Sequence, residues 1–187
     1  MSAPISLRSD RLILRPWRDE DVPAFAALNA DPQVMRYFPA VMSAEQSHAQ
    51  AAGIRHVMRQ RGWGLWAVEV KRGAPFIGFV GLAIPAGDLP CSPCVEIGWR
   101  LAAAHWGKGY AGEAARTALA CAFERLQLPE VVSFTAERNL PSRRVMERIG
   151  MRFDGETFLH PRLPAGHPLQ KHVLYRLSKQ QWREQTC

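Results

Sequence analysis

The sequence predicts an α/β fold in one domain, and three observations support this prediction. Stretches with the apolar spacing of helices alternate with short stretches rich in β-branched and aromatic residues. The chain has 187 residues, of which 47% are hydrophobic, and this suits a single core in one domain spanning 1–187. Glycine and proline separate the elements, and we find no internal repeat and no domain boundary.

The first third of the chain is expected to contain one strand followed by helices. Asp31-Pro32 places a capping side chain before a proline at the first helical position. The stretch 43–46 has the pattern of a capping box, and Gly62 is expected to end the helix that the box begins. The expected elements are a strand at 11–15, a helix at 19–29, a short turn after 31, and a helix at 43–61.

The rest of the chain is expected to be richer in strands. Gly78 and Gly81 interrupt one of them and predict a bulge or a close approach of two backbones. The expected strands are 65–70, 76–84, 94–100, 131–136, 151–158 and 171–177, and the expected helices are 111–126 and 141–149.

Composition limits the classes of partner and compartment. The net charge of +7 favours anionic partners, such as a phosphorylated cofactor. No run of 18 apolar residues is present, and residues 1–10 lack an apolar signal core, so we expect a cytoplasmic protein without a membrane partner. Cys91 and Cys94 form a lone CxxC motif without a second pair of ligands, so we expect reduced thiols and no metal site.

A glycine-rich stretch between a strand and a helix is the strongest functional signal. It comprises Trp106, Gly107, Lys108, Gly109, Tyr110, Ala111 and Gly112. Glycines allow a ligand to approach the backbone, and the N-terminus of a helix presents unpaired N–H groups with a positive dipole end. The loop therefore predicts an anion site, most often one for phosphate.

Two phosphate-binding classes fit this loop to different degrees. Residues 107–112 match the dinucleotide fingerprint GxGxxG, and Glu137 ends the next strand as a ribose ligand would. Against an oxidoreductase of this kind, residues 101–106 separate the strand from the first glycine, whereas the fingerprint joins them directly.

The second class uses more of the chain. The glycine loop, the strand-borne Glu96-Ile97-Gly98-Trp99 and the later Asn139-x-x-Ser142 together resemble the Gcn5-related N-acetyltransferase (GNAT) superfamily. The residues of these motifs, and those of the N-terminal stretch 12–17, are most similar to the branch of the ribosomal-protein N-terminal acetyltransferases RimJ and RimL. The resemblance covers about residues 10–178 and implies a mixed, mostly antiparallel central sheet flanked by helices.

The resemblance also implies an activity: acetyl transfer from acetyl-CoA to a primary amine of a protein N-terminus or a small molecule, by direct attack in a ternary complex. It implies that the pyrophosphate binds the N–H groups of 107–112 and that Asn139 bonds the pantetheine arm. The strand edge around Trp99 and Leu101 would pair with that arm, and Glu96 would act as general base. The resemblance does not identify the acceptor, which could be the N-terminus of a ribosomal or other protein. It also leaves open whether the protein is a monomer or a homodimer. We expect no direct binding of nucleic acid.

Two positions depart from the pattern of the superfamily. Trp106 replaces the usual arginine or glutamine at the entrance to the loop. Met146 stands where many members have the tyrosine that protonates the thiolate, and a thioether has no proton to give. Ser142, one helical turn earlier on the same face, is the expected substitute; a catalytically silent acyl-CoA-binding protein is the alternative. The aromatic residues expected near the amine are Tyr37, Phe38 and Trp63.

Overall fold

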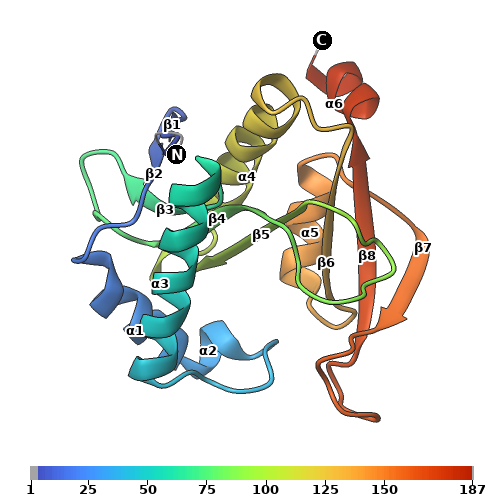
Figure 1. Ribbon diagram of the computed structural model, residues 1–187, viewed down its shortest axis with the longest axis horizontal. Coiled ribbons are helices and arrows are strands. Elements are labelled where there is room, and N and C mark those ends of the chain that lie inside the picture. The colour runs from blue at the N-terminus through green and yellow to red at the C-terminus, as the bar shows by residue number, and fades with distance from the viewer. Residues whose placement is uncertain (1–3, 187) are drawn as a thin grey trace.

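The computed structural model describes residues 4–186, and one sheet runs through all of it (Figure 1). The spatial order of the eight strands is β1-β2-β3-β4-β5-β6-β8-β7. Neighbouring strands are antiparallel except β5 and β6, which are parallel. The strands are β1 (Leu7–Arg8), β2 (Leu12–Arg15), β3 (Leu65–Val70), β4 (Gly78–Ala83), β5 (Glu96–Leu101), β6 (Glu130–Ala136), β7 (Arg152–Leu159) and β8 (Lys171–Ser178). The expected mixed, mostly antiparallel sheet is confirmed.

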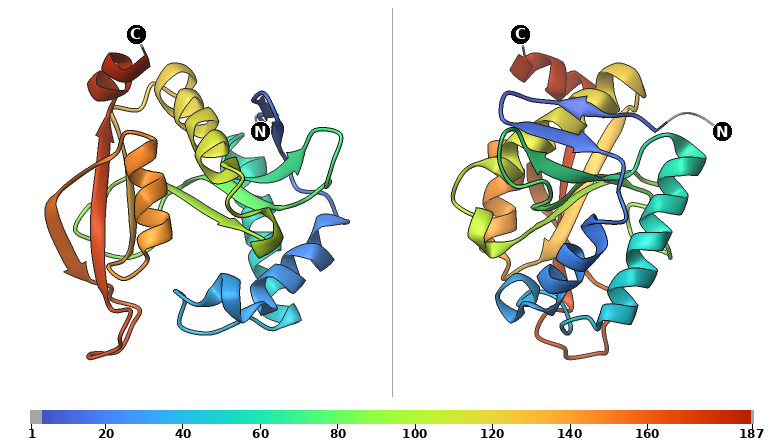
Figure 2. Two further views of the ribbon diagram at one scale, coloured as in Figure 1. Left: turned by 180° about the vertical axis from the view of Figure 1, so that it is seen from behind. Right: turned by 90° about the vertical axis from the view of Figure 1, so that its left-hand side faces the viewer.

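Helices cover both faces of this sheet. The right-hand view of Figure 2 shows α3 on one side of the strands and α5 on the other. The helical elements are α1 (Asp21–Ala30), α2 (Pro32–Met35), α3 (Ala44–Arg61), the 3₁₀ turn η1 (Ala103–His105), α4 (Tyr110–Ala120), the π-helical turn η2 (Cys121–Arg125), α5 (Leu140–Arg148) and α6 (Lys179–Thr186). None of the helices within residues 4–186 has the length and apolarity needed to cross a membrane.

The two faces of the sheet have separate cores. On one face, alanines of α4 pack against β4 and β5, and Ala114, Ala115 and Ala118 are fully buried. Small side chains allow a helix to lie close to the strands. On the other face, Trp17, Phe25 and Phe79 form an aromatic cluster beneath α1 and α3. Strand β5 lies between the two cores, so its alternate residues face different helices.

Local signals in the sequence account for most helix boundaries. The Ser43 side chain accepts from the Gln46 N–H while the Gln46 side chain accepts from the Ser43 N–H, so the expected capping box is confirmed. Gly62 ends α3 in the left-handed conformation at φ 80°, which favours glycine. Asp31 caps α2 through a 2.8 Å bond from Gln33 N–H, also as expected.

Gly78 and Gly81 mark close approaches of backbones, one of the two outcomes expected for them. A Cβ at Gly81 would lie 2.1 Å from the carbonyl oxygen of Gly64, and one at Gly78 would lie 2.1 Å from that of Arg100. The two glycines therefore allow β4 to lie between its neighbours without a side chain in the way.

Three features of the fold differ from the expectations. The helix expected at 111–126 ends its α-helical winding at Ala120 and continues as η2, where Leu126 N–H bonds Cys121 O, five residues back, at 2.9 Å. Neither the two-residue strand β1 nor the polar helix α6 was expected. Strand β1 is too short, and helix α6 too polar, to produce a periodic apolar pattern in the sequence. Strand β1 forms because it pairs with β2, and α6 forms because it packs against β8.

Candidate active site

The parallel strands β5 and β6 separate soon after they meet. They share one register pair, Glu96 with Val132, and Val132 N–H bonds Val95 O at 2.9 Å. The last link is a side-chain bond from Ser133 to Ile97 O at 2.8 Å. Beyond it the strands diverge (Figure 1), so the backbone groups on this edge of Gly98–Leu101 lie along a gap instead of a neighbouring strand.

The glycine loop opens α4 beside this gap. Gly107 and Gly109 have φ values of 72° and 79°, and Gly109 is the N-cap residue. The first bond of the helix joins Glu113 N–H to Gly109 O at 3.1 Å. The N–H groups of Tyr110, Ala111 and Gly112 precede it, and no hydrogen bond with an acceptor in residues 4–186 uses them. A Cβ at Gly107 would meet no atom within 4 Å, so this surface is open to an anion.

A clasp from the N-terminal hairpin supports the loop and was not expected from the sequence. The Glu113 carboxylate accepts from Ser9 Oγ at 2.7 Å and from Arg11 Nε at 2.6 Å. Burial alone would raise the pKa of Glu113, but the hydrogen bonds from Ser9 and Arg11 outweigh it and lower that pKa. Arg11 also donates to Lys108 O at 3.0 Å. Arg11 and Glu113 are 102 positions apart, so no local pattern connects them.

Glu96 lies at the point where β5 and β6 part. Across residues 4–186 its carboxylate forms no ion pair and no hydrogen bond. Burial raises the pKa of Glu96 from its ordinary 4.5 to about 8. A carboxyl group with this pKa exchanges a proton near neutral pH, as a general base must.

Two side chains meet across the gap. Trp99 Nε1 of β5 donates to Ser142 Oγ of α5 at 3.2 Å. No bond among the described residues uses the Ser142 hydroxyl proton, so that proton is available to a further acceptor. Met146, four residues on, is only 2% exposed and belongs to the core. The structure therefore brings Trp99 and Ser142 together and leaves Met146 beneath them.

The other predicted cofactor residues surround this pair. Asn139 caps α5, because its Oδ1 accepts from Ser142 N–H at 3.3 Å while its Nδ2 donates to Thr135 Oγ1 at 2.8 Å. Trp106 is 37% exposed and donates from Nε1 to Leu101 O at 2.8 Å, which secures the end of β5 next to the loop. Leu101 itself is buried.

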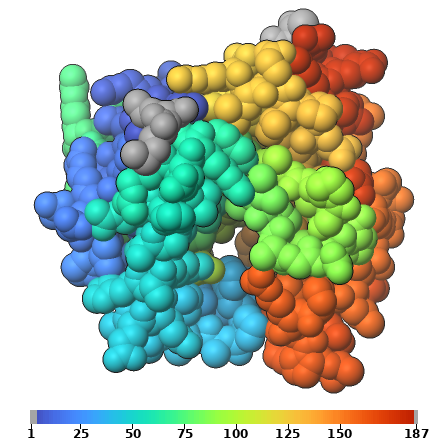
Figure 3. All heavy atoms as spheres, viewed as in Figure 1, coloured from blue at the N-terminus to red at the C-terminus, as the bar shows by residue number. Residues whose placement is uncertain are grey.

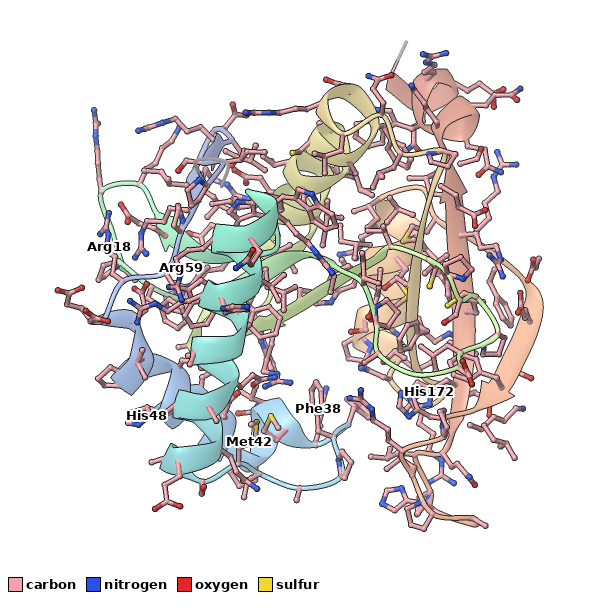
Figure 4. All side chains as sticks on the ribbon, in the orientation of Figure 1. Arg18, Phe38, Met42, His48, Arg59 and His172 are labelled. Carbon is pink, nitrogen blue, oxygen red and sulfur yellow. The ribbon has the colours of Figure 1, made fainter. Side chains whose placement is uncertain are left out.

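The opposite face of β5 borders a hollow. Figure 3 shows the depression between α3 and α2 on one side and the segments 85–93 and 160–168 on the other. In Figure 4, Phe38 points into this space near Met42, with His172 across from it. Phe38 lies over the Arg100 guanidinium at 4.2 Å, whereas the neighbouring Tyr37 lies against Arg36.

The three aromatic residues expected near the amine do not gather at one place. Phe38 and Tyr37 follow α2, whereas Trp63 follows the far end of α3, where it lies against Arg61. A helix of 18 residues is about 27 Å long, so α3 separates Trp63 from the other two. Arg100, which was not expected in the site, takes the place beside Phe38.

Cys91 and Cys94 are free thiols with their sulfur atoms 2.7 Å apart. Burial of Cys94 and its hydrogen bond with Cys91 raise the pKa of Cys94 to about 12. Within residues 4–186, no group of three or more His, Cys, Asp or Glu side chains is placed to hold a metal ion.

A diverging parallel pair inside an otherwise antiparallel sheet, with a glycine-headed helix beside the gap, defines an acyltransferase-type site. A family model described as an acetyltransferase (GNAT) domain matches residues 11–152 of the chain. The chain therefore belongs to the GNAT acetyltransferase family and is an acetyltransferase.

Individual proteins and solved structures are similar to this chain. YkkB, an uncharacterized protein of Bacillus subtilis, is 34% identical over 154 residues, which cover 82% of this chain and 88% of that protein. A GNAT-family acetyltransferase from Bacillus anthracis is similar in structure, with a TM-score of 0.78, 25% identity, and coverage of 94% of this chain and 99% of that one. Mycobacterium smegmatis RimJ, solved with CoA-disulfide, shares the fold at a TM-score of 0.73 and 19% identity, with coverage of 98% and 95%.

The alternative of a dinucleotide-dependent oxidoreductase is wrong. The sheet has one parallel pair where a doubly wound domain needs several, and the family is that of acetyltransferases. Glu137, which that reading assigned to a ribose, forms an ion pair with Lys171 at 2.7 Å instead.

Proposed function

We propose that the protein transfers the acetyl group of acetyl-CoA to a primary amine by direct attack in a ternary complex. The observation that carries the proposal is the gap between β5 and β6, which lies beside free N–H groups on one side and an unpaired carboxyl group on the other. In the reaction the amine nitrogen bonds the acetyl carbon while the carbon–sulfur bond breaks. The amine loses a proton and the departing sulfur gains one.

The cofactor would lie along the gap. Its pyrophosphate would bind the N–H groups of 107–112 at the start of α4, next to the Lys108 charge. The backbone of β5 at Trp99 and Leu101 would pair with the amide groups of the pantetheine arm, and a backbone N–H there would polarise the thioester carbonyl. The CoA-disulfide that accompanies RimJ, a protein of the same fold, supports a ligand of this kind. Bound acetyl-CoA supplies the activated acetyl group.

Glu96 is the proposed proton acceptor. Desolvation raises the pKa of its half-buried carboxyl to about 8, and the carboxyl has no partner within residues 4–186, so the ionised form is basic enough to receive the amine proton, directly or through a water.

Ser142 is the proposed proton donor to the thiolate. Its oxygen already accepts from Trp99 and its own proton is free for the sulfur. Direct attack is favoured over an acetyl-cysteine intermediate, because the raised pKa of Cys94 leaves little of the nucleophilic thiolate at neutral pH.

The acceptor would reach Glu96 from the hollow that Phe38 borders. We propose an amine of a small molecule or of a protein N-terminus, a cytoplasmic site of action, and one continuous catalytic domain that acts as a monomer or a homodimer.

A screen of primary amines tests the proposal, with release of free CoA from acetyl-CoA as the readout. We expect turnover that depends on both substrates, with N-acetylated product identified by mass spectrometry. Binding of acetyl-CoA without turnover on a broad amine panel would contradict the proposal and favour a silent acyl-CoA-binding protein.

A further inference from the structure

Arg100 is a buried cation without an anionic partner. The residue is 8% exposed, and its Nη1 donates to Asn29 Oδ1 at 2.7 Å and more weakly to Gln50 Oε1 at 3.4 Å. Both acceptors are neutral amides, and none of the ion pairs among residues 4–186 includes Arg100. Nε of Arg100 is the single buried side-chain nitrogen or oxygen in the described residues that lacks a hydrogen-bond partner.

The hydrogen bonds of Arg100 leave part of the guanidinium unused. All three of its hydrogen bonds, with Asn29, Gln50 and the Met42 sulfur, are made by Nη1. Nε is fully buried, whereas Nη2 is not and makes no hydrogen bond with another described residue, so its N–H groups remain for an anion such as a carboxylate. Burial lowers the pKa of Arg100 to about 10, so the side chain still carries its charge at neutral pH.

A buried charge without a partner is costly, and removing it or pairing it would stabilise the fold. The position of Arg100 suggests which partner is absent. Side chains alternate along a strand, so Arg100 lies on the same face of β5 as Glu96 and Gly98. Its contacts with α1 and α3 establish that this is the face of the hollow in Figure 3.

The surface between Glu96 and Arg100 is open. Gly98 lies midway and has no side chain, and a Cβ built there would meet only Glu96 Oε1, at 3.9 Å. Strand geometry puts the Cα atoms of Glu96 and Arg100 about 13 Å apart. A basic carboxylate at one end and an unpaired guanidinium at the other therefore border the same floor, with Phe38 as an apolar wall.

We propose that the acceptor is a small amine that also carries a carboxylate, and that the unpaired Nη2 group of Arg100 binds this carboxylate. The amine then lies toward Glu96 at Gly98. This inference rests on the proposed function, because it assigns the acceptor to the same site. Arg100 is here a specificity residue that does not take part in the proton transfers.

Matched pairs of acceptors test the inference. The series from glycine to 6-aminohexanoate varies the distance between amine and carboxylate, and each acid has a carboxamide that differs only in charge. For at least one length we expect the acid to exceed its carboxamide in kcat/KM by about ten- to a hundredfold, chiefly through KM, as a charge-assisted pair would give. A neutral tetrapeptide amide serves as a comparator for a protein N-terminus.

Variants connect the preference to Arg100. In Arg100→Gln the ratio of acid to carboxamide should fall to about one, and Arg100→Lys should keep part of it. Arg59→Gln, in the exposed last turn of α3, removes the same charge elsewhere and should keep the full ratio. Because Arg100 is buried, the melting temperature and the affinity for acetyl-CoA report whether each variant is folded.

A binding measurement separates this inference from the proposed function. Hexanoate lacks the amine, so calorimetry with hexanoate and hexanamide tests the carboxylate site without any acetyl transfer. Binding of hexanoate that Arg100→Gln abolishes would support the inference even if no amine were acetylated. Equal kcat/KM for acids and carboxamides in the parent, preference for the tetrapeptide amide over every acid, or equal binding of hexanoate and hexanamide would overturn it.

Discussion

At the residue scale, two side chains of the proposed site owe their chemistry to their surroundings. Desolvation raises the pKa of the half-buried Glu96, and Ser142 keeps a free proton because Trp99 supplies its incoming hydrogen bond. The raised pKa is a consequence of the site and not of the residue type, since an exposed glutamate has a pKa near 4.5.

Replacing Glu96 by Gln keeps the shape of the side chain and removes its basicity. We expect kcat/KM to fall by about 10²–10⁴, the usual effect of losing a general base. Because the pKa is raised, Glu96 holds its proton below pH 8, so the parent's advantage should be small at low pH. The ratio of parent to variant should rise with pH and level off above about pH 8. Measuring both proteins on one acceptor cancels the titration of the acceptor itself; a ratio independent of pH would remove Glu96 from the proton transfer.

Replacing Ser142 by Ala removes the proposed donor to the thiolate. A thiol has an ordinary pKa of about 8.5, so its thiolate leaves without much help and the loss in kcat should be about ten- to a hundredfold. Ser142→Cys retains a proton donor and should lose less. Single-turnover rates with saturating acetyl-CoA separate this effect from binding, and an unchanged rate in Ser142→Ala would assign the proton to solvent.

At the element scale, the shape of the glycine loop beside the β5–β6 gap is set by the helix that follows it and by the N-terminal hairpin. The glycine loop begins α4 with a left-handed residue at Gly109. The hairpin of β1 and β2 holds the first turn of that helix through Glu113. The loop is therefore shaped in advance for an anion, instead of being ordered by it.

Gly109→Val tests this preformed shape. At φ 79° a β-branched residue is strained whatever space surrounds it, so the loop must rearrange. Affinity for acetyl-CoA, measured by calorimetry, should fall at least tenfold while the protein stays folded. Gly53→Ala, on an open face of α3, is the matched control and should bind acetyl-CoA like the parent. If Gly109→Val also binds like the parent, the pyrophosphate lies elsewhere.

The elements that the sequence predicted are those with local signals. The capping box at Ser43 and the glycine at 62 lie next to the helix boundaries that they determine. The similarity of short motifs to those of a known family led to Glu96 and the glycine loop. The sequence did not point to Arg100, because its burial and its contacts depend on Asn29, Gln50 and Phe38, which come from three other segments. The clasp between Arg11 and Glu113 was missed for the same reason, since only the folded sheet brings the two together.

At the scale of the whole molecule, the proposed sites of the two substrates lie on opposite faces of the sheet. Trp99 and Leu101 face the side of α4 and α5, where the glycine loop would hold the cofactor, whereas Gly98 and Arg100 face the hollow below α3 (Figures 2 and 3). With this proposed arrangement each substrate would have its own approach to the same point on β5, and neither would need to leave before the other binds.

Steady-state kinetics with acetyl-CoA and the acceptor varied together test this central claim most directly. If both substrates bind before the acetyl group moves, reciprocal plots of rate against acceptor at several acetyl-CoA concentrations should give intersecting lines. Parallel lines, with an acetylated protein detectable by mass spectrometry in the absence of acceptor, would show a covalent intermediate and contradict direct attack across β5.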